Sequence, residues 1–138
     1  MRGHAEDTDI LAVRFKAENF SLSGDEYSSM AAFGDEPRQP KNYVLLQRIV
    51  NPSQEDIELG HDQVHIEING QERSEYGAIE TCLLQDEELR IMLNEDSAKR
   101  LRVASDIRIE LPSDADQMDE LSTFLAQLFT NGDQFRRQ

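Results

Sequence analysis

Apolar and polar residues alternate in several short stretches of the chain. A two-residue period of this kind is typical of a β-strand that buries one face. The stretches that show it are residues 11–17, 64–68, 79–83, 89–93 and 107–111. Residues 43–50, YVLLQRIV, are apolar on both faces and predict a central strand covered on both sides, and Asn69-Gly70 predicts a tight hairpin turn. The pattern indicates a meander of antiparallel strands.

Helix signals separate or follow these strands. A proline followed by acids predicts a short helix ending near Gly60, and Asn94 is placed to cap a second short helix. The clearest helix is the last one, which Ser113 or Asp114 can cap. Its apolar residues recur at a spacing of three or four: Met118, Leu121, Leu125 and Leu128. The predicted fold class is therefore α+β, a mostly antiparallel sheet with a C-terminal amphipathic helix packed on one face and one or two short helices.

The length of 138 residues suits one domain. We expect a single α+β domain over residues 9–133, preceded by a polar, frayed stretch over residues 1–8. The first residues lack the apolar core of a signal peptide, and no stretch approaches the roughly 18 apolar residues of a membrane helix. Cys82 is the only cysteine, which excludes an intramolecular disulfide. These features predict a cytoplasmic protein.

Acidic residues outnumber basic ones by 28 to 14, so the formal net charge is −14. Most of the imbalance is local, because residues 55–88 contain eleven acids and one base, Arg73. Such a surface repels nucleic acids and anionic membranes but speeds the capture of a basic protein. The simpler alternative is that these acids only solvate the outer face of a meander.

Residues that often carry catalysis or bind metals are present without a suitable arrangement. His61 and His65 have a zinc-binding spacing for a helix, but in an extended stretch, at about 3.3 Å per residue, their backbones would stand about 13 Å apart. Cys82 lies within a predicted strand and is interpreted as a packed core residue. The acid pairs and glycines match neither a glycosidase dyad nor a phosphate-binding loop. We therefore predict no enzyme, no cofactor and no metal, but a protein-binding role.

Four stretches in the middle of the chain support a more specific interpretation. They are KNYVLLQR (41–48), EDIELGHDQVHIEINGQ (55–71), SEYGAIE (74–80) and ELRIMLNEDSAKRL (88–101). In pattern and order they resemble a family of bacterial immunity proteins encoded beside polymorphic-toxin genes, immunity protein family ten. The resemblance implies a cytoplasmic α+β protein that binds a cognate toxin and blocks it, with no catalytic residue.

The resemblance is strongest where the chain is most acidic, so we expect the toxin to bind there. The expected partner-binding residues would pair with lysines or arginines on the toxin's active-site face. They are Asp56, Glu58, Asp62, Glu67, Glu72, Glu75 and Glu80. The alternative function is an acidic secretion chaperone for an effector protein. Such chaperones typically begin with an amphipathic helix, whereas residues 11–17 of this chain predict a strand. A homodimer and the identity of the toxin are left open.

Overall fold

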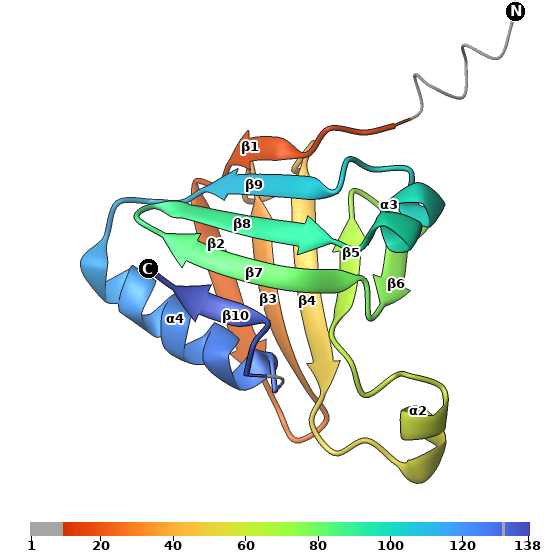
Figure 1. The fold of residues 1–138 in the computed structure, drawn as a ribbon. Coiled ribbons are helices and arrows are strands. Elements are labelled where there is room, and N and C mark those ends of the chain that lie inside the picture. The colour runs from red at the N-terminus through yellow and green to blue at the C-terminus, as the bar shows by residue number, and fades with distance from the viewer. Residues whose placement is uncertain (1–9, 131) are drawn as a thin grey trace, which may run out of the picture.

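The computed structural model describes residues 10–130 and 132–138, in which two five-stranded sheets lie face to face (Figure 1). The first sheet has the order β1 (Arg14–Lys16), β9 (Asp106–Glu110), β8 (Glu88–Leu93), β7 (Ile79–Gln85) and β10 (Phe135–Arg137). The second has the order β2 (Asn19–Gly24), β3 (Ser28–Gly34), β4 (Tyr43–Ile49), β5 (His65–Ile68) and β6 (Ser74–Tyr76). The helices are α2 (Gln54–Glu58), α3 (Glu95–Leu101) and α4 (Ala115–Leu128).

The α+β class and the mostly antiparallel pairing are confirmed, and the predicted fraying of residues 1–8 lies outside the described residues. Strands β7, β8 and β9 form an antiparallel meander as predicted. The strand near residues 64–68 is not part of it, because β5 pairs with β4 in the other sheet. Strands with the same alternation can bury their apolar face from either side of a shared core, so alternation alone does not assign a strand to a sheet.

A β-bulge changes which residues of β7 face the core. The register shifts between Ile79 and Thr81, and a bulge adds one residue to a strand. The alternation predicted over residues 79–83 would put Ile79, Thr81 and Leu83 on one face, and this is wrong beyond the bulge. Cys82 and Leu84 point into the core instead and are each 1% exposed. The interpretation of Cys82 as a packed core residue is confirmed.

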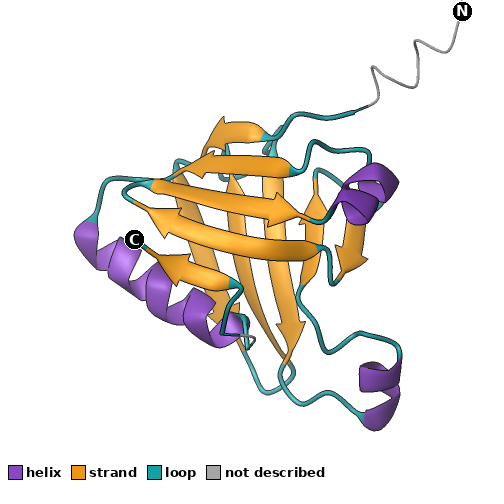
Figure 2. Ribbon diagram, viewed as in Figure 1, coloured by secondary structure: helices purple, strands orange, loops and turns teal. Residues whose placement is uncertain are grey.

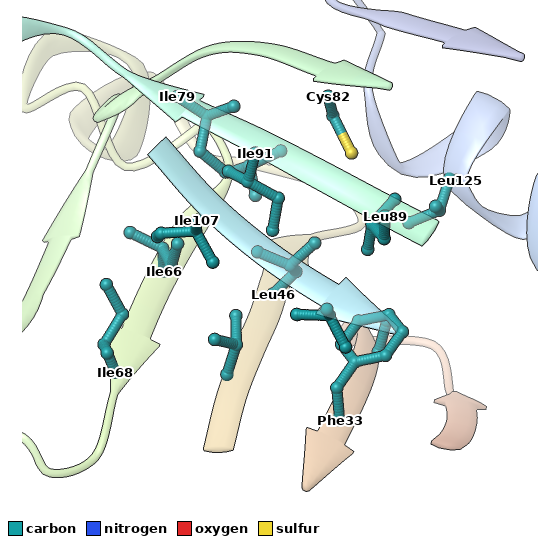
Figure 3. Packing of buried hydrophobic residues seen from close by; sticks show 14 of the residues in the cluster. Phe33, Leu46, Ile66, Ile68, Ile79, Cys82, Leu89, Ile91, Ile107 and Leu125 are labelled. Atoms are coloured by element: carbon teal, nitrogen blue, oxygen red, sulfur yellow. The ribbon is translucent and has the colours of Figure 1, made fainter. Parts of the chain in front are cut away.

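The core lies between the two sheets and is built from their inner faces (Figure 3). Its largest fully buried side chains come from both sheets and from α4. They include Phe33, Leu46, Ile66, Leu89, Ile91, Ile107, Leu121 and Leu125. Burying each such side chain contributes about 1.5–3 kcal/mol. The two sheets therefore form one scaffold, on which outward-facing residues can vary at little cost to folding.

Helix α4 lies along the margin of the sandwich beside β10, and α3 lies at the opposite margin near β6 (Figure 2). The Asp114 carboxylate caps α4 by accepting a hydrogen bond from the Gln117 amide at 3.0 Å. At its other end, the Arg48 guanidinium donates to the carbonyl oxygen of Leu128 at 3.3 Å. The buried face of α4 is the stripe that the sequence predicts, from Met118 to Leu128.

Candidate partner-binding surface

Strand β4 is central in the second sheet, but only one of its faces is fully covered. Val44 and Leu46 point into the core and are 0% exposed. On the outer face, Leu45 is half-buried and Gln47 is exposed. The prediction that residues 43–50 are covered on both sides is therefore wrong, and the outer face of this sheet is accessible to a partner.

A groove of about 390 Å³ runs over this outer face, beneath the loop at 35–42. Pro37, Pro40 and Leu45 supply apolar lining, whereas Glu36 and Glu67 supply carboxylates. Glu36 and the two prolines were not predicted to belong to a binding surface, because the sequence of this loop is typical of a polar connection. The sequence signal for them is Leu45, an apolar residue at an outward position of the strand, which indicates that another segment partly covers this face.

Local contacts hold the loop over the sheet. The Asp35 carboxylate accepts hydrogen bonds from the backbone amides of Lys41 and Asn42, at 3.0 and 3.1 Å. A Cβ atom on Gly34 would lie 3.2 Å from Cβ of Pro40, so glycine permits the close approach of Pro40 to the strand. The groove is thus formed by the chain itself before any partner binds.

A tyrosine and a carboxylate that both line the groove are hydrogen-bonded to each other. The Tyr43 hydroxyl donates a hydrogen bond to Oε2 of Glu67 at 2.7 Å. This bond, together with burial and the negative charges of Glu67 and Glu72, raises the pKa of Tyr43 to about 12. Two of the predicted partner-binding residues therefore act on this hydroxyl, Glu67 through a hydrogen bond and Glu72 through its charge.

An aromatic cluster lies next to Glu67 on the same outer face. The Tyr76 ring stacks on His61 with centroids 4.4 Å apart and meets the edge of His65 at 4.6 Å. Burial lowers the pKa of His65. The expected extended path from residue 61 is wrong, because the strand begins only at His65 and residues 61–63 form a turn and a bend. Within the described residues, no group of three or more His, Cys, Asp or Glu side chains is placed to hold a metal.

Three further predicted residues belong to the connection between β4 and β5. Asp56 closes a capping box, in which its carboxylate accepts hydrogen bonds from the Ser53 amide and hydroxyl, both at 2.9 Å. Glu58 is exposed at the end of α2, and Asp62 is half-buried in the turn that follows. The carboxylates of this segment therefore lie at one end of the second sheet.

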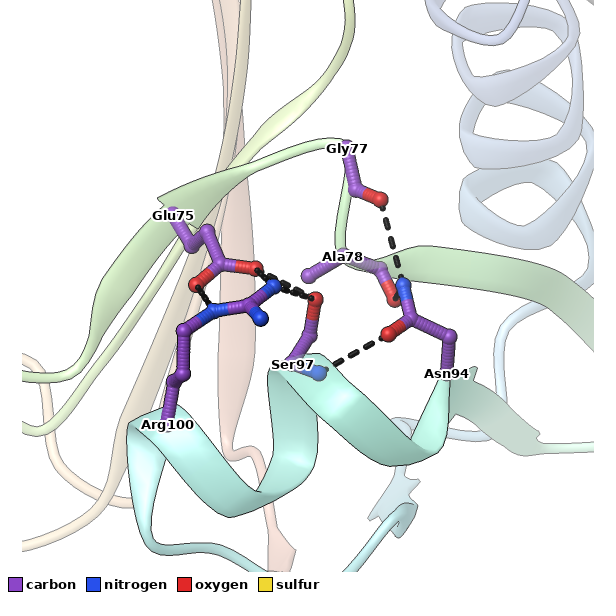
Figure 4. A network of polar contacts seen from close by, with 6 residues as sticks. All are labelled: Glu75, Gly77, Ala78, Asn94, Ser97 and Arg100. Atoms are coloured by element: carbon purple, nitrogen blue, oxygen red, sulfur yellow. Dashed lines mark hydrogen bonds and ion pairs between the residues drawn. The ribbon is translucent and has the colours of Figure 1, made fainter.

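Glu75 and Glu80 lie elsewhere. Glu75 is opposite the inward-facing Ile66 and binds α3 (Figure 4). Its carboxylate accepts two hydrogen bonds from Arg100, both at 2.8 Å, and one from the buried Ser97 hydroxyl. These bonds, chiefly those from Arg100, lower the pKa of Glu75 although burial opposes the shift. Glu80 is exposed in the other sheet, at the bulge of β7.

The outer face of the first sheet has a different charge pattern. Arg90 binds the Asp106 carboxylate at 2.9 Å, and Arg108 reaches the carboxylates of Asp106 and Glu88 at 3.3 and 3.7 Å. Acids on that face are therefore balanced by arginines. None of the ion pairs found among the described residues involves Glu36 or Glu67, the two carboxylates that line the groove.

Comparison with known proteins identifies one family. The sequence profile of the family described as Immunity protein 10 matches residues 9–119, which is most of the chain. No curated protein matches the sequence. In the part of the chain that the structure describes, no helix is long and apolar enough to cross a membrane.

Proposed function

The chain belongs to the Immunity protein 10 family, and we propose that it binds a cognate bacterial toxin in the cytoplasm and neutralises it without catalysis. The toxin contacts the outer face of the second sheet and the adjoining turn. The acids that serve this contact are Asp56, Glu58, Asp62, Glu67 and Glu72, joined by Glu36. Their proposed partners are lysines and arginines on the active-site face of the toxin, which an immunity protein would cover.

The observation that carries this proposal is the groove lined by Tyr43, Glu36 and Glu67. It combines apolar surface with carboxylates on an accessible sheet face. Interfaces commonly have this composition, with apolar contacts at the centre and charged groups that steer association. Glu75 and Glu80 are left out of the surface, because the first is engaged by Arg100 and the second lies in the other sheet.

Charge reversal at Glu67 and Glu72 tests this surface. We expect the E67K/E72K variant to bind the toxin encoded beside its gene at least about tenfold more slowly at low salt, because electrostatic steering raises on-rates by roughly 10- to 1,000-fold. The matched control is E26K/E120K, which changes the net charge equally at exposed positions on the β2–β3 turn and on α4. Equal association rates for the two variants, measured in stopped flow, would remove the electrostatic basis of the proposal.

Rescue of growth tests the function itself. Co-expression of the protein should protect cells from the toxin, and purified protein should bind an inactivated form of it. If protection fails while the secretion of an effector increases, the protein is a secretion chaperone instead.

A further inference from the structure

The connection between β4 and β5 is longer than the strands require. Ile49 ends β4 and His65 begins β5, and the two strands are antiparallel neighbours. A hairpin of two to five residues is the common way to join such strands. Here the chain instead extends away from the sandwich and forms α2 (Figure 1). We call residues 50–63 the α2 arm.

Helix α2 is ordered by hydrogen bonds within the arm, which contacts the rest of the protein at its two ends, through Val50 at one and His61 and Asp62 at the other. Ser53 and Asp56 cap the helix reciprocally, and the amides of Gly60 and His61 bond to carbonyl oxygens of the same turn. No residue of α2 is buried. Ile57 and Leu59 are 47% and 60% exposed. They are two residues apart in helical conformation, so their side chains lie on opposite sides of α2, and exposed large apolar side chains on one element commonly mark an interaction site.

Charge decides what can cover these apolar side chains. The α2 arm contains Glu55, Asp56, Glu58 and Asp62 and has no lysine or arginine. A second copy of the chain would bring the same four negative charges against them. A pocket that is apolar at its centre and rimmed by lysine or arginine complements both features, since its charges would pair with the carboxylates that surround Ile57 and Leu59.

We propose that the α2 arm is an anchor that enters an apolar, basic-rimmed cleft of the toxin, where Ile57 and Leu59 contact opposite walls of the cleft. This inference rests on the proposed function, which already includes the arm's acids Asp56, Glu58 and Asp62, and adds an apolar contact beside them. The groove around Glu67 steers the toxin to the protein, whereas the arm slows its release. Because the arm is folded by its own capping box before binding, little ordering cost opposes the contact.

The test compares I57S/L59S with the wild-type protein and with Ile10→Ser, which removes a large apolar side chain of similar exposure from the start of the described chain. The probe is an inactivated form of the toxin encoded beside the gene, with binding followed by surface plasmon resonance. We expect I57S/L59S to dissociate roughly 10- to 100-fold faster, as for the loss of two central contacts, with an unchanged association rate. Ile10→Ser should match the wild-type protein.

The outcomes separate the two proposals. If wild-type protein does not bind or neutralise the toxin, the proposed function is wrong. If the wild-type protein binds and I57S/L59S dissociates at the same rate, the function stands and the anchor is wrong. A dimer that depends on Ile57 in sedimentation velocity would also overturn the anchor, because the occupant would then be a second copy.

Discussion

Glu75 offers the sharpest distinction between acids that bind a partner and acids that stabilise the fold. Replacing it with alanine removes a carboxylate that holds Arg100 and Ser97 on α3 against β6. Glu75→Gln is the matched variant, because it keeps the shape and one acceptor oxygen, while it removes the charge and replaces the other oxygen with an N–H donor. We expect both variants to lose stability and to keep their affinity for the toxin.

The size of the loss follows from the exposure of the two partners. The Arg100 side chain is 60% exposed, so solvent screens the ion pair and its contribution is about 0.2–1 kcal/mol. Ser97 is 1% exposed, and losing the acceptor of its buried hydroxyl costs about 1–3 kcal/mol. Glu75→Ala should therefore cost about 2 kcal/mol, and Glu75→Gln under about 1 kcal/mol.

Urea unfolding followed by circular dichroism measures these losses, and a double-mutant cycle with Arg100→Ala isolates the ion pair. The pH dependence supplies a second check. Because the folded-state pKa of Glu75 is lowered, its contribution is present above its unfolded value of 4.5 and is lost as the pH falls below it. The reasoning is refuted if Glu75→Ala unfolds at the wild-type urea concentration, or if it weakens toxin binding without weakening the fold.

Three other expectations concern the core and the aromatic cluster. Burial raises the pKa of the Cys82 thiol, so a thiol reagent should label it only in denaturant; rapid labelling of folded protein would contradict its position. Burial lowers the pKa of His65, so stability should fall as the pH drops below 6.5, and His65→Gln should flatten that dependence in pH-resolved melting curves. Leu121→Ala should cost about 2–5 kcal/mol in urea unfolding, and a loss below 1 kcal/mol would place α4 off the core.

Local patterns predicted the elements with a strong periodicity and missed those with a weak one. The alternation of Leu89, Ile91 and Leu93 predicted β8, and the cap at Asn94 predicted the start of α3. Strands β2, β6 and β10 were not predicted. Serines and a glycine dilute the apolar positions of β2, and β6 and β10 span only three residues each. All three are edge strands whose pairing with a neighbour, rather than their own pattern, defines them.

The structure divides the predicted partner-binding acids in a way that the sequence does not indicate. A count of charges treats all acids between residues 55 and 88 alike. In the structure, Glu75 is engaged by Arg100, which is 25 residues away and outside that segment. Glu36 also lies outside that segment, and it lines the groove because the loop at 35–42 folds over β4. Which acids are free for a partner depends on such long-range contacts, which sequence patterns do not contain.

Residues that stabilise the fold and residues that are exposed on the α2 arm differ in how freely they can be substituted. Ile57, Leu59 and Glu58 contribute nothing to the buried core, so substitutions there alter the surface offered to a toxin at little cost in folding. Glu75 and Leu121 lack that freedom, because each change opens an unsatisfied contact or a cavity. Because the core lies between the two sheets and the α2 arm lies outside them, the proposed toxin-binding residues of the arm can be substituted without loss of the fold.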